Sequence, residues 1–161
     1  MSGSSSADRA RPLYLEDLEV GQRFASGTRI VGADEIIAFA REFDPQPFHL
    51  GEDSARKTIF GGLAASGWHT AAITMRLIVE GGPPIAGGIL GAGGEIGWPK
   101  PTRPGDTLRV VSEILEIKPS RSRPDRGSVI MRTQTLNQHD DVVQTLTARL
   151  VVPRRDGKDG A

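Results

Sequence analysis

The most informative stretch of this chain is FAREFDPQPFHL, which spans residues 39–50. It joins a segment of helical character to a proline-rich one, in which Pro45 and Pro47 lie two residues apart. The residue before a proline is biased away from helical backbone angles, so a preceding helix should end here. We therefore predict a stiff loop from Asp44 to Leu50, in which an acidic side chain and an imidazole are held in place.

A helix is predicted immediately before this loop. Ile36, Ala40 and Phe43 recur at helical spacing. Asp34 and Glu35 stand where the helix would begin, and their negative charge suits the positive end of the helix dipole.

Two further helical segments are predicted after the loop. A short turn is expected over residues 52–57, and the glycine pair Gly61-Gly62 then forms a loop. Residues 67–79 form the longest helical segment, and nearly all of their side chains are small or apolar. A helix that is apolar nearly all round is buried on most sides, so we expect this one to lie inside the protein.

The remaining segments have the composition of β-structure. Alternation is clearest after residue 106, where Leu108, Val110 and Ser112 share one face of a strand and Val111 lies on the other. The polar residues 137–141 are typical of a hairpin turn, and the glycine-rich segment 85–98 is expected to be irregular. Strands are predicted over residues 22–31, 107–117, 128–136 and 142–152.

This order of elements predicts the fold class. One buried helix followed by a run of antiparallel strands indicates an α+β architecture, in which the sheet curls around the helix. We expect a single domain over residues 13–153. A disordered tail rich in Ser and Gly should precede it at residues 1–12, and a charged tail should follow at residues 154–161.

The composition limits the classes of function that are open to the chain. The 20 Lys and Arg residues balance the 20 Asp and Glu residues, which argues against a nucleic acid or a membrane surface as partner. The chain has no Cys, so disulfides, a thiolate nucleophile and a thiolate metal site are excluded. Its start lacks the apolar centre of a signal peptide, and its longest apolar segment, residues 63–79, is interrupted by polar residues. We expect a soluble cytoplasmic protein.

Three blocks of the sequence resemble the MaoC-like dehydratases and (R)-specific enoyl-CoA hydratases. The first is the stretch at residues 39–50, where an Asp and a His five residues apart flank a Gln-Pro pair. The second, FGGLAASGWH at residues 60–69, is similar to the block that opens the central helix of this family. The third, WPKPTRPGDTL at residues 98–108, is similar to a turn that leads into the next strand. The likeness extends from about Tyr14 to Pro153.

The resemblance carries expectations about fold, assembly and activity. It implies a hot dog fold, in which an antiparallel sheet wraps a long central helix, and a homodimer whose two sheets commonly join edge to edge. It also implies a hydro-lyase of fatty acid metabolism that acts on a thioester of CoA or of an acyl carrier and needs no other cofactor. The catalytic Asp and His of the family fall on Asp44 and His49.

The sequence departs from the family pattern at three places. Gln46 stands where the family usually has Asn, and the amide group is kept. Gly51 stands where an acidic residue is often found, with Glu52 and Asp53 just beyond it. Ser66 occupies the position of the His in a common Ala-His-Gly motif. These differences bear on the identity of the substrate more than on the type of reaction.

The chemistry explains why such residues are needed. Hydration of a trans-2-enoyl thioester, the reverse of (R)-3-hydroxyacyl dehydration, requires a base for the water, a proton for the α-carbon and donors for the thioester oxygen. An imidazole titrates near neutrality, so His49 suits the water, while Asp44 either holds that water or supplies the α-proton. Backbone N–H groups near Ser66 and Gly67, at the start of the long helix, are the candidate oxyanion donors.

Four further residues are candidates for the pocket wall. They are Gln46, Phe48, Trp68 and Trp98, although a Trp before a proline, as at Trp98, is more typical of a core or interface position than of a pocket wall. Two other functions remain open for the same fold. One is an acyl-CoA thioesterase, and the other is a non-catalytic module that binds an acyl thioester.

Other conspicuous residues have structural interpretations. His69 is expected to be hydrogen-bonded near the start of the long helix, and His139 to be solvated in a turn. Their spacing to His49 does not match a metal site. The run Gly91-Ala92-Gly93-Gly94 indicates close packing or a strand bulge rather than a phosphate loop. The arginine-rich loop at residues 121–127 is either solvated or attracts the phosphates of CoA.

Overall fold

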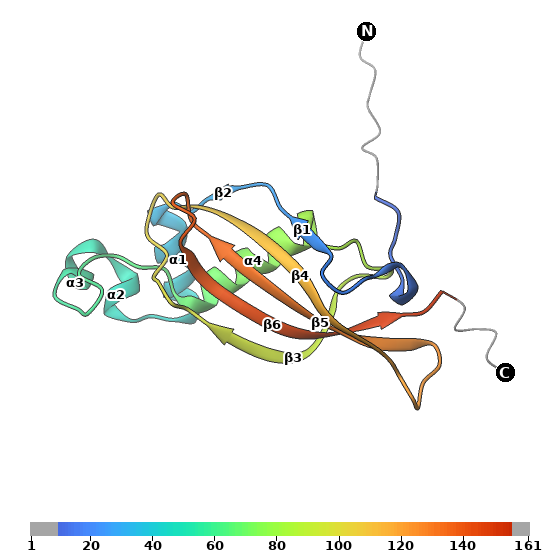
Figure 1. The fold of residues 1–161 in the computed structure, drawn as a ribbon. Coiled ribbons are helices and arrows are strands. Elements are labelled where there is room, and N and C mark those ends of the chain that lie inside the picture. The colour runs from blue at the N-terminus through green and yellow to red at the C-terminus, as the bar shows by residue number, and fades with distance from the viewer. Residues whose placement is uncertain (1–9, 156–161) are drawn as a thin grey trace, which may run out of the picture.

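The computed structural model describes residues 10–155, and these form one antiparallel sheet that curls around one long helix (Figure 1). In chain order the elements are η1 (Leu15–Asp17), β1 (Arg23–Ala25), β2 (Arg29–Ile30), α1 (Ala33–Phe43), α2 (Pro47–Leu50), α3 (Glu52–Arg56), α4 (Gly67–Gly81), β3 (Leu90–Gly97), β4 (Thr107–Pro119), β5 (Arg126–Leu136) and β6 (Val142–Pro153).

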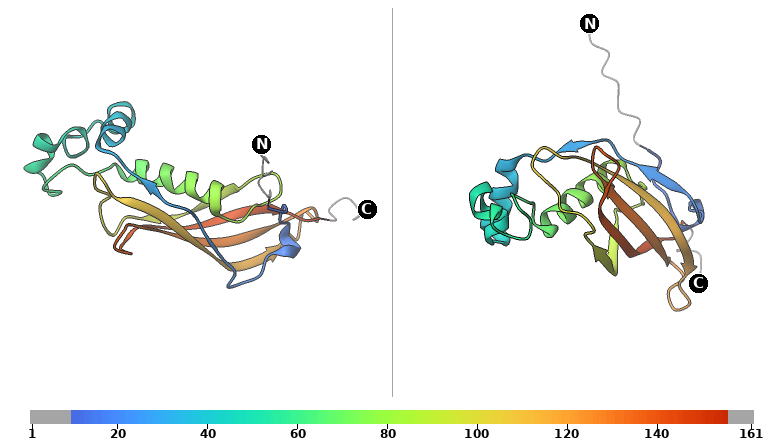
Figure 2. Two further views of the ribbon diagram at one scale, coloured as in Figure 1. Left: turned by 90° about the horizontal axis from the view of Figure 1, so that it is seen from above. Right: turned by 60° about the vertical axis from the view of Figure 1, so that its left-hand side comes forward.

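The sheet has the strand order β1-β4-β5-β6-β3, and β2 also pairs with β4. Every strand pair in it is antiparallel. Figure 2 shows α4 lying along one face of the curved sheet, while α1, α2 and α3 gather beyond the first turn of α4. The predicted α+β architecture is confirmed.

The core lies between α4 and the face of the sheet that it covers. Side chains along β4 alternate in burial, and Leu108, Val110 and Ile114 point into the core. Ile73 and Leu77 of α4 pack onto the same core. A fully buried aliphatic side chain of this kind contributes about 1.5–3 kcal/mol, so this layer fixes the position of α4 and of its first residues.

The prediction that the long helix is buried on most sides was wrong. Trp68, Met75 and Val79 of α4 are 61%, 39% and 65% exposed. The sheet covers only one side of the helix, and the opposite side carries an apolar strip that nothing in the described chain covers.

The prediction that residues 85–98 are irregular was also wrong, because β3 lies within this segment. Its pairing with β6 uses backbone groups, which glycines supply as well as any other residue. The expected strand bulge and close packing are both found. The register shifts between Gly91 and Gly93, and a Cβ on Gly94 would overlap the carbonyl oxygen of Thr147.

Two other expectations need correction. The strand predicted over residues 22–31 is divided into β1 and β2, because the Ser26 hydroxyl replaces a backbone acceptor for the N–H of Val110 at 2.9 Å. The predicted loop from Asp44 to Leu50 contains the short helix α2. Pro47 is its first residue, where the missing N–H of proline costs no hydrogen bond.

The predicted first helix and the predicted hairpin turn are confirmed. In α1 the carboxylate of Glu35 accepts a hydrogen bond from the N–H of Gly32 at 2.9 Å, which stabilises the first turn. In the turn between β5 and β6, the side chain of Asn137 accepts hydrogen bonds from the N–H groups of His139 and Asp141.

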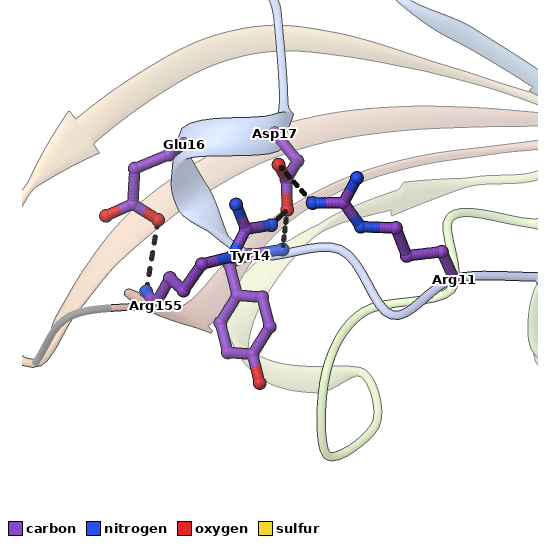
Figure 3. A network of polar contacts seen from close by, with 5 residues as sticks. All are labelled: Arg11, Tyr14, Glu16, Asp17 and Arg155. Atoms are coloured by element: carbon purple, nitrogen blue, oxygen red, sulfur yellow. Dashed lines mark hydrogen bonds and ion pairs between the residues drawn. The ribbon is translucent and has the colours of Figure 1, made fainter.

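A polar network joins η1 to the end of β6 (Figure 3). Arg155 pairs with Asp17, and its backbone N–H donates to Glu16 at 3.1 Å. The N–H of Tyr14 donates to Asp17 at 2.9 Å. This hydrogen bond, together with the charges of Arg155 and Arg11, lowers the pKa of Asp17. Arg155, which the sequence placed in the charged tail, therefore contacts the folded domain.

The predicted tails fall mainly on residues 1–9 and 156–161, which lie outside the described residues. Between residues 10 and 155, no helix combines the length and the apolar character needed to cross a membrane.

Candidate active site

The turn between α1 and α2 brings Asp44 and His49 side by side. Asp44 directly follows α1, and its N–H donates to the carbonyl of Ala40 at 2.9 Å. Pro47 then starts α2, which carries His49. The Nε2 atom of His49 lies 3.4 Å from Oδ2 of Asp44, and only 6% and 17% of the two side chains are exposed.

A backbone carbonyl fixes the protonation pattern of His49. Its Nδ1 lies 2.6 Å from the carbonyl oxygen of Ala64. A carbonyl oxygen can only accept a hydrogen bond, so Nδ1 carries a proton. In the neutral imidazole, the free lone pair is therefore on Nε2, which faces Asp44.

Asp44 is held as a carboxylate by two donors. The hydroxyl of Ser66 donates to Oδ2 at 2.6 Å, and the amide of Gln46 donates to Oδ1 at 2.5 Å. Burial by itself would raise the pKa of Asp44. The two hydrogen bonds and the neighbouring His49 outweigh that effect, and the pKa lies below the ordinary aspartate value.

The first residues of α4 complete this site. Ser66 is fully buried and caps the helix, since its Oγ accepts a hydrogen bond from the N–H of Trp68 at 3.3 Å. Gly67 is the first helical residue, so the helix itself offers no acceptor for its N–H. A Cβ at Gly67 would lie 2.7 Å from the ring of Trp98, and only glycine fits against this indole.

A pocket of about 440 Å³ opens beside His49, between the start of α4 and the segment that follows β3. Its wall is mostly apolar, with a pair of buried hydroxyls, those of Thr70 and Thr102, 3.0 Å apart. The lining residues are His49, Phe60, Ala65, Gly67, Thr70, Trp98, Pro99, Lys100, Pro101 and Thr102.

The four residues proposed for the pocket wall lie in different places. Trp98 lines the pocket, and its indole N–H donates to the buried Gln144 at 2.9 Å. Gln46 is exposed and bonded to Asp44, and Phe48 packs edge-on against His49 with ring centroids 4.5 Å apart. Trp68 points outward from α4 and meets Trp98 edge-on.

A family profile described as MaoC like domain matches residues 17–135 of this chain. The chain belongs to the MaoC-like domain family. The MaoC-like dehydratase from Rhodospirillum rubrum, a crystal structure, is 62% identical, with a TM-score of 0.87 over 89% of this chain and 98% of that chain.

Two further relatives of this MaoC-like domain are a dehydratase and a hydratase. The 3-hydroxybutyryl-CoA dehydratase of Methylorubrum extorquens is 31% identical over 155 residues, which cover 92% of this chain and 90% of the relative. The unliganded R-hydratase PhaJ1 from Pseudomonas aeruginosa is 26% identical, with a TM-score of 0.70 over 89% of this chain and 88% of that chain. The predicted hot dog fold is confirmed, and the chain is a hydro-lyase of the MaoC-like family.

Sequence reasoning missed several residues of the MaoC-like site. Phe60, Thr70 and Thr102 line the pocket, and Ala64 supplies the acceptor for His49. All but Thr70 lie within the second and third sequence blocks, so those blocks marked the right segments. The sequence pattern does not show that the carbonyl of Ala64 contacts the side chain of His49, which lies 15 positions earlier in the chain.

The other histidines lie away from the pocket. His69 is buried and stacked on Phe39 with ring centroids 4.7 Å apart, and its Nδ1 has no partner within the described chain. Burial lowers the pKa of His69, although the charge of Glu35 acts in the opposite direction. His139 is exposed in its turn. Across residues 10–155, no three His, Asp or Glu side chains cluster as metal ligands would.

Proposed function

We propose that this MaoC-like hydro-lyase reversibly hydrates trans-2-enoyl thioesters to (R)-3-hydroxyacyl thioesters, presented on CoA or on an acyl carrier. The observation that carries this proposal is the state of His49. Its Nδ1 donates to the Ala64 carbonyl, so its Nε2 is free to bind water beside the Asp44 carboxylate, and His49 itself lines the pocket. The relatives that are a dehydratase and a hydratase support the same reaction.

The roles of the two residues follow from their surroundings. The lowered pKa of Asp44 makes it a poor proton donor, so we assign to it the orientation of the water. As the water oxygen bonds to the β-carbon, its proton passes to Nε2 of His49. The electron pair of the double bond moves toward the thioester oxygen. His49 then delivers a proton to the α-carbon, which restores the neutral imidazole.

The start of α4 is proposed to stabilise the charge on the thioester oxygen. The N–H of Gly67 is free of helical hydrogen bonds, and the positive end of the helix dipole lies at the same place. One such donor typically accelerates a reaction by about 10²–10³-fold. This acid–base chemistry requires no cofactor besides the thioester itself.

An assay of two activities in parallel tests the function. We expect the ultraviolet absorbance of crotonyl-CoA, or of a longer or branched enoyl-CoA, to fall without release of free thiol. Thiol release from acyl-CoA without hydration would instead identify a thioesterase. Thermal stabilisation by acyl-CoA with neither activity would identify a binding module.

We also propose that two copies of the chain form a dimer along β3 and the open side of α4. Trp68, Ala72, Met75 and Val79 are exposed on this helix, at intervals that put them on one side. The neighbouring β3 is the last strand of the sheet, and no other described strand pairs with its outer edge. Antiparallel pairing of two β3 strands would satisfy that edge and cover the apolar strip.

A charge placed on this strip should dissociate the dimer. Val79→Glu would force a carboxylate into the apolar contact. In analytical ultracentrifugation we therefore expect the wild-type chain to sediment as a dimer and the variant as a monomer. Ile30→Glu is the matched control. Ile30 is about as exposed as Val79, but it lies in β2, which pairs with β4 at the edge of the sheet far from β3. A monomeric wild type, or a dimeric Val79→Glu, would contradict the interface.

A further inference from the structure

The carbonyl that accepts a hydrogen bond from His49 belongs to a loop whose backbone is bonded to Arg103. This loop, residues 60–66, carries the Ala64 carbonyl that accepts from His49 and ends at Ser66, which donates to Asp44. The guanidinium of Arg103 donates to three carbonyls at the beginning of the same loop. The acceptors are Phe60 at 2.6 Å, Gly62 at 3.0 Å and Leu63 at 3.3 Å.

The loop is held from the other side by Glu52. This residue of α3 accepts a hydrogen bond from the N–H of Leu63 at 3.1 Å. The peptide that joins Gly62 to Leu63 therefore has its carbonyl bonded to Arg103 and its N–H bonded to Glu52. Both of these loop residues are buried, so their backbone groups depend on protein partners.

Arg103 is itself well fixed. Its backbone N–H donates to the buried carboxylate of Asp106 at 2.8 Å, and Asp106 also accepts from Gln138 at 3.0 Å. The residue before Arg103 contributes as well, because the N–H of Ala65 donates to the carbonyl of Thr102 at 2.9 Å. The Ala65–Thr102 bond and the guanidinium bonds of Arg103 thus join two loops that both contribute residues to the pocket wall.

We propose that Arg103 is a positioning residue for the hydration reaction. It acts through the 60–66 loop on the Ala64 carbonyl, and this carbonyl holds the proton of His49 on Nδ1. A guanidinium suits the task because its donors form a rigid fork that reaches several acceptors at once, whereas an ammonium acts as a point charge. The kinetic part of this inference rests on the proposed function, but the effect on His49 does not.

Replacement of Arg103 should loosen the 60–66 loop without removing any residue that lines the pocket. Three carbonyls lose their donor in Arg103→Met, and the loop relaxes toward other partners. The Ala64 carbonyl then no longer selects one tautomer of His49. Because sub-ångström placement controls such chemistry, we expect kcat to fall about 10-fold or more with a smaller change in KM. Arg103→Lys should recover part of the loss, since an ammonium can still reach some of the carbonyls.

The test combines kinetics with nuclear magnetic resonance of the imidazole nitrogens. In the wild-type chain, the His49 signals, assigned by their absence in His49→Gln, should show a single tautomer protonated at Nδ1. We expect Arg103→Met to show both tautomers and Arg103→Lys to be intermediate. Arg56→Met is the matched control, because Arg56 is exposed on α3 and, among the described residues, forms an ion pair only with Asp53. It should leave both kcat and the His49 signals unchanged.

Two outcomes would overturn the inference. One is an Arg103→Met variant with wild-type kcat and unchanged His49 signals. The other is a loss of kcat that accompanies a lowered melting temperature while the His49 tautomer stays fixed, since that result assigns Arg103 a general structural role. Failure of the proposed function has a different signature. The wild-type chain would then hydrate no enoyl thioester, yet Arg103→Met would still change the His49 tautomer.

Discussion

A His49→Gln variant is expected to lose enoyl-thioester hydration, with kcat/KM reduced by about 10²–10⁴-fold. Glutamine can still donate a hydrogen bond to the Ala64 carbonyl, so the short helix α2 and the 60–66 loop should stay in place. It cannot accept and return a proton at the position of Nε2. The measurement is the rate of absorbance loss with crotonyl-CoA, compared with the wild-type chain under the same conditions.

The control for this variant is His139→Gln, because His139 is exposed in the turn between β5 and β6, away from the pocket. It should hydrate at the wild-type rate. Both variants should melt within a few degrees of the wild-type chain and keep its oligomeric state. A His49→Gln variant that retains hydration within about 10-fold of the wild type would remove His49 from the role of base.

The segments that form the site could be predicted from the sequence because their signals are local. The prolines of residues 39–50 end α1 and start α2, and this alone fixes the separation of Asp44 and His49. The glycine-rich start of α4 and the turn before β4 were likewise marked by short motifs. The resemblance to the MaoC-like dehydratases then indicated the type of reaction, since the spacing of Asp44 and His49 by itself does not distinguish a catalytic pair from a polar contact.

The partners of these residues could not be predicted, because they depend on contacts between distant parts of the chain. Ser66 was expected to offer a backbone donor at the helix start, yet its hydroxyl is also bonded to Asp44, 22 residues away. Arg103 holds carbonyls about 40 residues before it and was only one member of a turn motif in the sequence.

The fold was mispredicted where the environment of a segment overrides its composition. Glycines made β3 look irregular, but pairing with β6 requires only backbone groups. The small apolar residues of α4 suggested burial on most sides, whereas the sheet covers one side and leaves Met75 and Val79 open. Both mistakes fall on the surface proposed to bind a second copy of the chain. For α4 the reason is that a pattern that suits an interface between chains cannot be told from a pattern that suits a core.

An Asp44→Asn variant should lower kcat by about 10²-fold or more while preserving the shape of the site. The carboxylate accepts hydrogen bonds from both Ser66 and Gln46 and faces His49. An asparagine has one carbonyl oxygen and one amide, so it must place a donor against one of these donors. The water would then lose the charged acceptor that orients it. Asp53→Asn, at a fully solvated position on α3, is the control and should keep wild-type activity.

The same variant tests whether the site holds Asp44 in its ionised form. Because the folded-state pKa of Asp44 is lowered, its ionisation adds stability at every pH above the unfolded-state value of about 3.9. That contribution disappears as the pH falls through the folded-state value. The difference in unfolding free energy between the wild type and Asp44→Asn should therefore shrink as the pH falls below about 5. Denaturant titrations across this range measure it. A difference that grows as the pH falls below about 5 would show that burial controls the pKa of Asp44 instead of its hydrogen bonds, and Asp44 would then become the better candidate to donate the α-proton.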